Sequence, residues 1–267
     1  MFVVNESSNQ VYAASTTDTV DWTTATPVKQ TSQAALCLIP FNSGLCLAFI
    51  SNDSSHRILI CLSTDGQTWT DNYHTGQTSP ARPALTVFNS KLWVAFISND
   101  KSDRLLICSS EDGKTWSDNE QVTGQTTSTG PALASFNGLL WVAFVANNPG
   151  NQLLVCSSPD GKTWSGNSLV SSATSPQQPS LAVFNDRLWL AFLDNDNDVW
   201  ITSSSDGQFW TAQPKPTRLP SQTAPSLTVF DETLYLGCIG SSNEITLYSS
   251  SDGATWSEGS VIFPPTV

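Results

Sequence analysis

The stretch Ser63-Thr64-Asp65-Gly66-Gln67-Thr68-Trp69 decides the fold, because its pattern returns at even intervals along the 267-residue chain. Six tryptophans lie four residues after an aspartate, and the last five of these boxes read Ser-x-Asp-Gly-x-x-Trp. The six pairs are Asp18/Trp22, Asp65/Trp69, Asp112/Trp116, Asp160/Trp164, Asp206/Trp210 and Asp252/Trp256. Successive aspartates are 47, 47, 48, 46 and 46 residues apart. Such a period is typical of a solenoid, a propeller or an array.

The sequence between the boxes repeats as well. Leu92-Trp93-Val94-Ala95-Phe96, for example, returns almost unchanged at residues 140–144 and 188–192. Each unit holds four short runs rich in β-branched and aromatic residues, separated by Asn, Gly, Pro and Asp. Runs that are apolar on both faces fit sheets stacked on both sides. The pattern predicts an all-β chain, a β-propeller of four-stranded antiparallel blades in a single domain over residues 1–267.

The number of blades depends on how the ring closes. Full repeats lie near residues 36–78, 83–126, 131–174, 179–220 and 225–262, and a partial repeat lies near residues 1–28. We expect six blades, with Phe263–Val267 supplying the missing first strand, so that both ends of the chain share one blade. The alternative is a five-bladed ring with residues 1–28 as an appendage.

The charge and hydropathy of the chain exclude several classes of protein. It has 23 acidic and 11 basic side chains, a formal net charge of −12, and only 13% charged residues. This balance argues against nucleic acid as a partner, which needs clustered Lys and Arg. No run approaches the ~18 apolar residues of a membrane span, so we expect a soluble protein without membrane insertion; an oligomer is compatible with the sequence. Residues 1–6 lack the pattern of a signal peptide, which predicts a cytoplasmic or leaderless-secreted protein.

Cysteine and carboxylate spacing predicts neither a metal nor another cofactor. Cys61, Cys108 and Cys156 share one repeat position, too far apart on successive blades for the ~5.5 Å Cα–Cα distance of a disulfide. Cys37 and Cys46 could face each other across the first predicted hairpin, which leaves one disulfide open. The run of alternating acids over residues 194–198 lacks the Gly and Glu of a calcium-binding EF-hand loop.

The boxes resemble the Asp-box, or BNR, repeats of sialidase-like six-bladed propellers, and the resemblance covers nearly the whole chain. It implies that each box is a turn between the third and fourth strands, on the face opposite the ligand site. The Asp can accept hydrogen bonds from turn amides, the Gly can adopt a positive φ, and the Trp packs beneath the turn. We therefore predict a structural role for the boxes, and a place in the core for Trp93, Trp141 and Trp189.

The resemblance also implies glycosidic cleavage, by three arginines on the substrate carboxylate, a Tyr/Glu nucleophile pair and an Asp. Leu38-Ile39-Pro40 stands where the family's Arg-Ile-Pro motif would supply the first arginine. Arg57 and Arg104 are repeat equivalents, which indicates duplication rather than a triad. No Tyr and Glu form an evident pair. We therefore predict no enzyme activity, although a paired-carboxylate glycosidase of another kind remains an alternative.

The loops opposite the boxes carry the groups that hydrogen-bond sugar hydroxyls. We predict a lectin with several similar shallow sites, whose multivalent binding to glycans gives avidity. The candidate ligand-binding residues are Asn52, Arg57, His74, Gln77, Arg82, Asn99, Asp100, Arg104, Gln125, Asn147, Gln152, Asn195 and Asn243. Polar hairpin loops copied with their repeats would give the same pattern without binding. The alternative functions are a glycoside hydrolase of sialidase-like fold and a protein-interaction scaffold.

Overall fold

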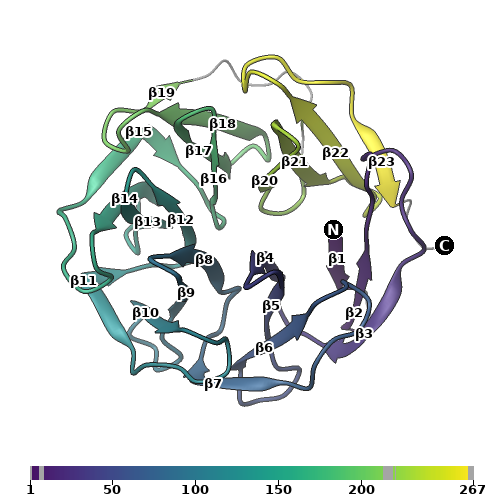
Figure 1. The fold of residues 1–267 in the computed structure, drawn as a ribbon. Coiled ribbons are helices and arrows are strands. Elements are labelled where there is room, and N and C mark those ends of the chain that lie inside the picture. The colour runs from purple at the N-terminus through teal and green to yellow at the C-terminus, as the bar shows by residue number, and fades with distance from the viewer. Residues whose placement is uncertain (1, 6–8, 213–218, 220, 264–267) are drawn as a thin grey trace. The chain divides into compact units, whose positions relative to one another are not determined.

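The computed structural model describes residues 2–5, 9–212, 219 and 221–263. Within these residues the chain is all β, with five four-stranded antiparallel sheets and one three-stranded sheet (Figure 1). No helix of this part is long and apolar enough to cross a membrane. We call the strands of each four-stranded sheet A, B, C and D in chain order. Consecutive strands pair, so each sheet is a simple meander.

The first half of the chain holds three sheets. Their strands are β1 (Phe2–Asn5), β2 (Gln10–Ala14) and β3 (Thr26–Thr31); β4 (Cys37–Phe41), β5 (Gly44–Ile50), β6 (Arg57–Ser63) and β7 (Tyr73–Thr78); and β8 (Ala84–Phe88), β9 (Lys91–Ile97), β10 (Arg104–Ser110) and β11 (Glu120–Thr126). The second half holds the other three sheets. Their strands are β12 (Ala132–Phe136), β13 (Leu139–Val145), β14 (Gln152–Ser158) and β15 (Ser168–Thr174); β16 (Ser180–Phe184), β17 (Arg187–Leu193), β18 (Val199–Ser204) and β19 (Thr211–Ala212); and β20 (Ser226–Phe230), β21 (Thr233–Ile239), β22 (Ile245–Ser250) and β23 (Ser260–Phe263).

The predicted fold class, a β-propeller of four-stranded antiparallel blades, is confirmed, but the number of complete blades is five, the alternative count. The partial repeat forms the three-stranded sheet β1–β3, with the three strands expected of it. Phe263 does not begin a closing strand; it pairs with Ile245 as the end of the fourth strand of the last sheet. The remainder of the predicted closing strand, residues 264–267, lies outside the described residues.

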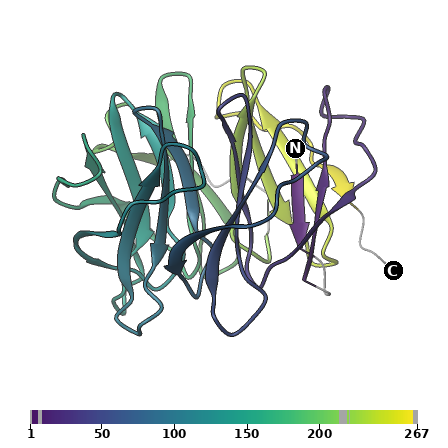
Figure 2. The same ribbon diagram turned by 60° about the horizontal axis from the view of Figure 1, so that its bottom comes forward.

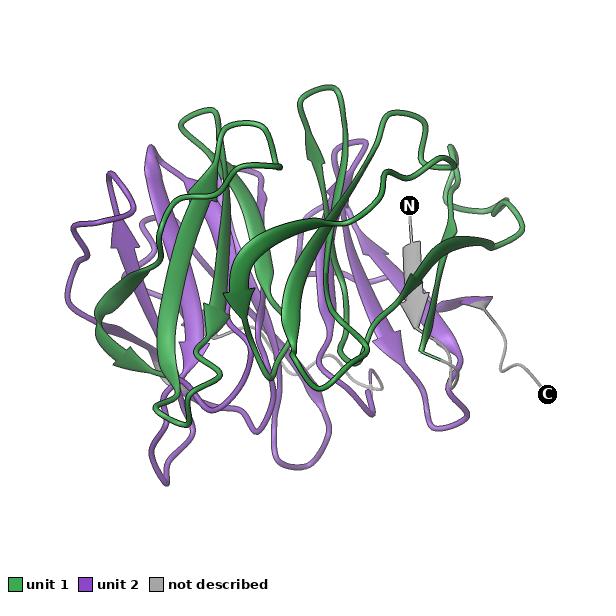
Figure 3. Cartoon of the chain, turned by 90° about the horizontal axis from the view of Figure 1, so that it is seen from below, with its two compact units in different colours: residues 1–126 green, residues 127–267 purple. Residues whose placement is uncertain are grey.

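The chain divides into two compact units, residues 1–126 and 127–267 (Figure 3). Each unit holds three sheets, and the prediction of a single domain over the whole chain stays a prediction. Figure 2 shows that the strands of each sheet run side by side and turn at two opposite ends. The B–C turns therefore lie at one end of each sheet, and the A–B turns and the boxes lie at the other.

Within a unit, neighbouring sheets stack through their apolar faces. One face of the β4–β7 sheet, including Phe49, packs with Val11 of the first sheet. The opposite face, including Ile60, packs with Val94 and Phe96 of the β8–β11 sheet. A strand in this arrangement is buried on both sides, which explains why the central runs of each repeat lack polar alternation. Burial of both faces is the main source of stability for these sheets.

A fully buried Ser or Thr precedes each four-stranded sheet. The residue recurs at the same repeat position, with none of its surface exposed, as Ser32, Ser79, Thr127, Ser175 and Ser221. The Ser32 hydroxyl donates to the Ala34 carbonyl and accepts from the amide of Ile50, while its own amide donates to Asn9. The Ser32 side chain thus satisfies backbone groups of two segments and its amide satisfies a third, as buried polar groups must.

The boxes form closed hydrogen-bonded turns between the third and fourth strands. In the second box the Asp65 carboxylate accepts from the amides of Gln67 and Thr68, and the Ser63 hydroxyl accepts from the amide of Gly66. Gly66 has a φ of 73°, in the left-handed region that favours glycine. These backbone hydrogen bonds lower the pKa of Asp65 to about 2. The other box carboxylates accept the same two amide hydrogen bonds, at Asp18, Asp112, Asp160, Asp206 and Asp252. The geometry gives the box a role in fixing the turn.

The box tryptophans are less enclosed than the sequence suggested. We expected each of them to pack beneath its turn, but all six are only half-buried: Trp22, Trp69, Trp116, Trp164, Trp210 and Trp256. The reason is their place in the chain, because each box leads into the last strand of its sheet, at an open edge. One side of the indole therefore meets solvent. The other side packs against the apolar core, as is seen for Trp69, Trp116, Trp210 and Trp256.

The indole N–H groups of the boxes differ from one another. Trp210 Nε1 donates to the carbonyl of Gly207 in its own box at 3.1 Å. The buried Nε1 atoms of Trp116 and Trp164 have no hydrogen-bond partner among the described residues. A shared indole hydrogen bond is therefore not what fixes the turn. That role belongs to the Asp and Ser side chains, and these tryptophans contribute mainly through ring contacts.

Three tryptophans predicted to lie in the core do so. Trp93, Trp141 and Trp189 are 8%, 3% and 3% exposed, and each indole N–H donates to the carbonyl of the Phe five residues earlier. The Trp141 ring covers the box glycine of the next sheet, so that a Cβ on Gly207 would lie within 2.5 Å of three ring carbons. The core tryptophans and the box turns therefore form one interlocked element.

Cys37 and Cys46 do not form the disulfide that the sequence left open. The register pairs Cys37 with Ala48 and Cys46 with Ile39, so the two thiols are not directly opposite each other. All six cysteines are free.

Candidate functional site

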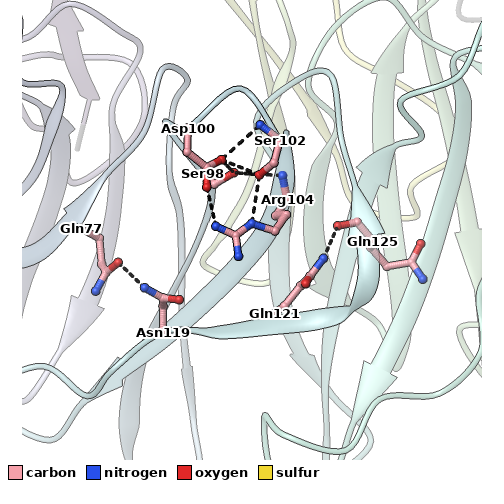
Figure 4. Close-up of polar contacts among 8 residues, drawn as sticks. All are labelled: Gln77, Ser98, Asp100, Ser102, Arg104, Asn119, Gln121 and Gln125. Atoms are coloured by element: carbon pink, nitrogen blue, oxygen red, sulfur yellow. Dashed lines mark hydrogen bonds and ion pairs between the residues drawn. The ribbon is translucent and has the colours of Figure 1, made fainter.

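One B–C turn carries a closely hydrogen-bonded group of four side chains, which we call the clasp: Ser98, Asp100, Ser102 and Arg104. The Asp100 carboxylate accepts from both serine hydroxyls and from the Arg104 guanidinium. Arg104 Nε donates to the Ser102 hydroxyl at 2.9 Å, and the Arg104 amide donates to Ser98 at 3.0 Å. The turn places these residues on one side because the strands close it between residues 98 and 104 (Figure 4).

The preceding sheet holds a copy of the clasp. Asp53 accepts from Ser51, Ser55 and Arg57, with an Nη2–Oδ2 distance of 2.7 Å to the arginine. The serine and arginine hydrogen bonds hold the pKa of Asp53 and of Asp100 well below the usual range. Both carboxylates are therefore charged acceptors at neutral pH and are poor general acids, which need a raised pKa.

The later B–C turns are closed differently. The Asn148 side chain accepts from the Gly150 amide and donates to the Gln152 side chain. Asp194 accepts from the amides of Asp196 and Asp198 and from the Trp200 indole N–H at 2.6 Å. The residue that closes the turn is therefore Arg57, Arg104, Gln152, Asp198 or Glu244, depending on the sheet. The residue at this position thus differs in charge between repeats, and the turn itself shortens from seven residues (51–57, 98–104, 146–152) to five (194–198, 240–244).

His74, Gln77 and Gln125 do not lie in D–A loops, as the sequence suggested, but in the edge strands β7 and β11. These strands carry few apolar residues because they are edge strands with much of their surface exposed. In each strand the pairing register with the neighbouring strand also shifts. In β7 the shift lies between the pair Arg57/Thr78 and the pair Leu59/His74. Gly76, with a φ of 77°, lies within this irregularity.

Four residues with amide side chains lie along these edge strands in two pairs, Gln77 with Asn119 and Gln121 with Gln125, and we call the four the amide cluster. Asn119 donates to the Gln77 side chain at 2.7 Å, which joins β7 to the segment before β11 (Figure 4). Gln121 donates to the Gln125 carbonyl, and Gln125 donates to the Thr123 carbonyl. Gln121 is fully on the surface and Gln77 is half-buried. The cluster is neutral and offers both donors and acceptors.

The other predicted ligand residues lie where the sequence placed them or close by. Exposed asparagines stand in the B–C turns as Asn52, Asn99, Asn147, Asn195 and Asn243. Asn52 accepts from the Asn9 side chain at 3.0 Å. Arg82 lies between β7 and β8, half-buried, and its Nε atom has no hydrogen-bond partner among the described residues. Each turn therefore keeps its own asparagine.

Several residues of the site were missing from the sequence prediction. Ser98 and Ser102 complete the clasp, Asn119 and Gln121 complete the amide cluster, and Glu244 closes the last turn. The signal for the clasp was present, because Ser-Asn-Asp-x-Ser-x-Arg occurs twice, at residues 51–57 and 98–104. Asn119 could not be found in this way, since its partner lies 42 residues away. Among the described residues, no group of three His, Cys, Asp or Glu side chains is arranged to hold a metal ion.

The comparisons with known proteins agree on the fold. A family model described as a DUF6242 beta propeller domain matches residues 158–261. No curated protein sequence matches the chain. A fungal lectin from Aleuria aurantia, described as a six-bladed β-propeller with fucose recognition, has a TM-score of 0.70 at 12% identity, over 99% of this chain and 91% of that one.

Two further solved structures are of different function. A lectin from Burkholderia pseudomallei has a TM-score of 0.70 at 13% identity, over 95% of this chain and 78% of that one. A Hadza microbial sialidase has a TM-score of 0.66 at 18% identity over 86% of this chain, which spans 58% of the sialidase chain. At these identities the likeness establishes the fold alone, a propeller of the kind found in both lectins and glycosidases.

Proposed function

We propose that this propeller binds carbohydrate without cleaving it. The observation that carries the proposal is the clasp, which occurs twice and ties both turn-closing arginines to a carboxylate of their own turn. A sialidase needs arginines that are available to a substrate carboxylate. The Arg–Asp pair as a whole has no net charge and is held in one geometry, which suits hydroxyl groups better than an anionic substrate.

The amide cluster supports the same reading. Amide side chains can donate and accept at once, as each sugar hydroxyl also does. They carry no charge, so removing their hydration when a neutral ligand binds costs less than it would for an ionised side chain. The cluster joins residues of two neighbouring sheets through the Gln77–Asn119 hydrogen bond. A ligand contacting it would therefore span the boundary between two repeats.

The clasp lies in the β8–β11 sheet, whose edge strand β11 and the residue before it carry Asn119, Gln121 and Gln125 of the amide cluster. Copies of these groups would give the proposed lectin more than one site. The β4–β7 sheet repeats the clasp and carries His74 at the register position that Gln121 holds in the β8–β11 sheet, opposite Leu59 and Leu106 respectively. Equivalent weak sites on one chain raise the effective affinity for a surface that displays many glycans. Glycans displayed on such surfaces are therefore the proposed partners.

The proposal is tested by glycan-array binding followed by titration of the best ligand into the full chain. We expect the Gln77→Ala and Gln121→Ala variants to weaken binding by about three- to tenfold each, since each removes one or two hydrogen bonds. Gln67→Ala, an exposed glutamine in a box at the other end of the sheet, is the matched control and should bind like the parent chain.

A parallel assay with fluorogenic glycosides separates the lectin from the hydrolase. We expect no sugar release above that of a heat-denatured sample. Sugar release that disappears in the Asp100→Asn variant would show that the protein is an enzyme rather than a lectin. Failure of every array glycan to bind at millimolar concentration would leave the interaction scaffold as the better function.

A further inference from the structure

The last four-stranded sheet departs from the other four at one cross-strand position on its second and third strands. There the other sheets pair Phe49 with Leu59, Phe96 with Leu106, Phe144 with Leu154, and Phe192 with Trp200. The last sheet pairs Cys238 with Thr246 instead. A bulky apolar pair is thus replaced by two small side chains, one of them polar.

Two neighbouring positions change with it. Tyr248 stands where the other sheets have Cys61, Cys108, Cys156 or Thr202. Each of these residues lies two positions after the third-strand member of the cross-strand pair described above. Gly240 opens the B–C turn where other sheets have a residue with a side chain, and a Cβ there would overlap the Glu244 carboxylate. The missing side chain therefore makes room for the carboxylate.

The loss of bulk at Cys238 and Thr246 accompanies a hollow of about 160 Å³, lined by Gln222, Cys238, Gly240, Ser241, Glu244, Thr246 and Tyr248. A single water needs about 10–15 Å³, so the hollow has room for a small organic molecule. Its lining carries an amide, two hydroxyls, a phenol and one carboxylate. Cys238 forms its floor and is 2% exposed, whereas Gln222 is exposed.

The charge of the lining is one-sided. Glu244 is its only charged residue, and the carboxylate forms no ion pair with the residues that the structure describes. One carboxylate oxygen accepts from the Ser242 amide at 2.9 Å, which fixes the group beside the hollow. Burial, with Cys238 and Glu244 nearby, raises the pKa of Tyr248 and keeps its phenol protonated. The lining has no positive charge to balance Glu244, so a ligand with a cationic group would complement it.

We propose that this hollow binds a small hydroxylated primary amine, such as an amino sugar, with its ammonium group on Glu244. The ammonium group supplies the missing counter-charge and donates charge-assisted hydrogen bonds to the carboxylate. The Tyr248 ring adds attraction for a cation close to its face. The hydroxyl groups of the ligand meet Gln222, Ser241 and Thr246. The site is separate from the clasp and the amide cluster and does not depend on the proposed lectin function.

The experiment titrates glucosamine and glucose separately into the full chain, followed by calorimetry and by amide chemical shifts. Glucosamine should bind at least tenfold more tightly than glucose, because only glucosamine carries the ammonium group. Glu244→Gln keeps the shape of the side chain and should abolish this preference. Glu258→Gln, an exposed carboxylate of the same sheet region outside the hollow, is the matched control and should change nothing.

A second variant removes the hollow instead of the charge. The double substitution Cys238→Phe with Tyr248→Cys restores the residues that most other sheets have at these positions, so it is expected to fold with an unchanged melting temperature. It should lose glucosamine binding and keep any glycan binding that depends on Gln77. Equal binding of glucosamine and glucose, no binding of either at tens of millimolar, or unchanged binding by Glu244→Gln would each overturn the proposal.

Discussion

The contact between a core tryptophan and the box glycine of the next sheet predicts how much each box glycine contributes to stability. A Cβ on Gly207 would lie within 2.5 Å of three ring carbons of Trp141, and Gly207 has a φ of 78°. Gly113 offers a matched comparison, with a φ of 75° but a nearest neighbour at 3.3 Å, the end of the Leu62 side chain. The two glycines differ only in what lies beside them.

Substitution by alanine separates the two contributions. The left-handed backbone costs an alanine about 1–2 kcal/mol at either position. Overlap with a packed ring adds about 1–3 kcal/mol at residue 207. We therefore expect Gly113→Ala to lower the free energy of unfolding by about 1–2 kcal/mol and Gly207→Ala by about 2–5 kcal/mol. At this chain length 1 kcal/mol corresponds to a shift of about 2–4 °C in melting temperature.

The assay is urea unfolding of the parent chain and both variants, with thermal melts as a second measurement. A double-mutant cycle with Trp141→Leu checks the cause, because removing the ring should recover most of the extra loss at residue 207. Equal destabilisation by the two alanine variants would refute the reasoning. So would a cycle in which Gly207→Ala costs the same with and without the Trp141 ring.

Other predictions follow from the charges and thiols. Burial raises the pKa of Cys61, Cys108, Cys156 and Cys238 to about 12, from a usual value of 9.0. Their stabilising contribution is therefore complete below pH 9 and is lost as the pH rises through 12, which urea midpoints across that range would record as a steady fall. The same thiols should resist a thiol reagent at pH 8 until urea unfolds the chain, and rapid labelling of the native protein would contradict this. Backbone hydrogen bonds lower the pKa of Asp252 to about 2, so its contribution is present above pH 3.8 and is lost as the pH falls through 2; Asp252→Asn should make unfolding less dependent on pH in that window. Asp100→Ala should cause only a small loss of stability in denaturant titrations, because the Arg104–Asp100 pair is nearly half exposed.

The sequence predicts the parts of the fold that depend on burial and on local turns. The box pattern, the apolar central strands and the core position of Trp141 could all be read from it, because each imposes its own residue types. The edge strand β7 could not, since its sequence Tyr-His-Thr-Gly-Gln-Thr has neither an apolar run nor alternation. An edge strand with a register shift around Gly76 needs neither. The sequence therefore suggested a loop at these residues.

The candidate site was predictable in part for a related reason. The clasp is local, with its acid and its arginine four residues apart, so the repeated sequence indicates where it lies. The sequence nevertheless placed Arg104 and Asp100 among ligand-binding residues without showing that they pair with each other. The Gln77–Asn119 contact joins two repeats and has no local signature. Cys238 lies on the second strand of its sheet, and the strand register shows that its four equivalents are phenylalanines.

Comparing the repeats separates the residues that hold the scaffold together from those that vary in the B–C turns. Features that hold the backbone are nearly the same in every copy: the buried Ser or Thr at each sheet junction is fully enclosed in all five places. The residue that closes the B–C turn has no such constraint, because its backbone makes the turn whatever its side chain is. That position changes from Arg57 and Arg104 to Gln152, Asp198 and Glu244, and so from paired cation to neutral amide to anion. The turn changes with it, from seven residues at 51–57, 98–104 and 146–152 to five at 194–198 and 240–244. The scaffold therefore fixes the buried junctions and leaves the B–C turns open to change in length and charge, so chemical differences between the repeats concentrate in these turns.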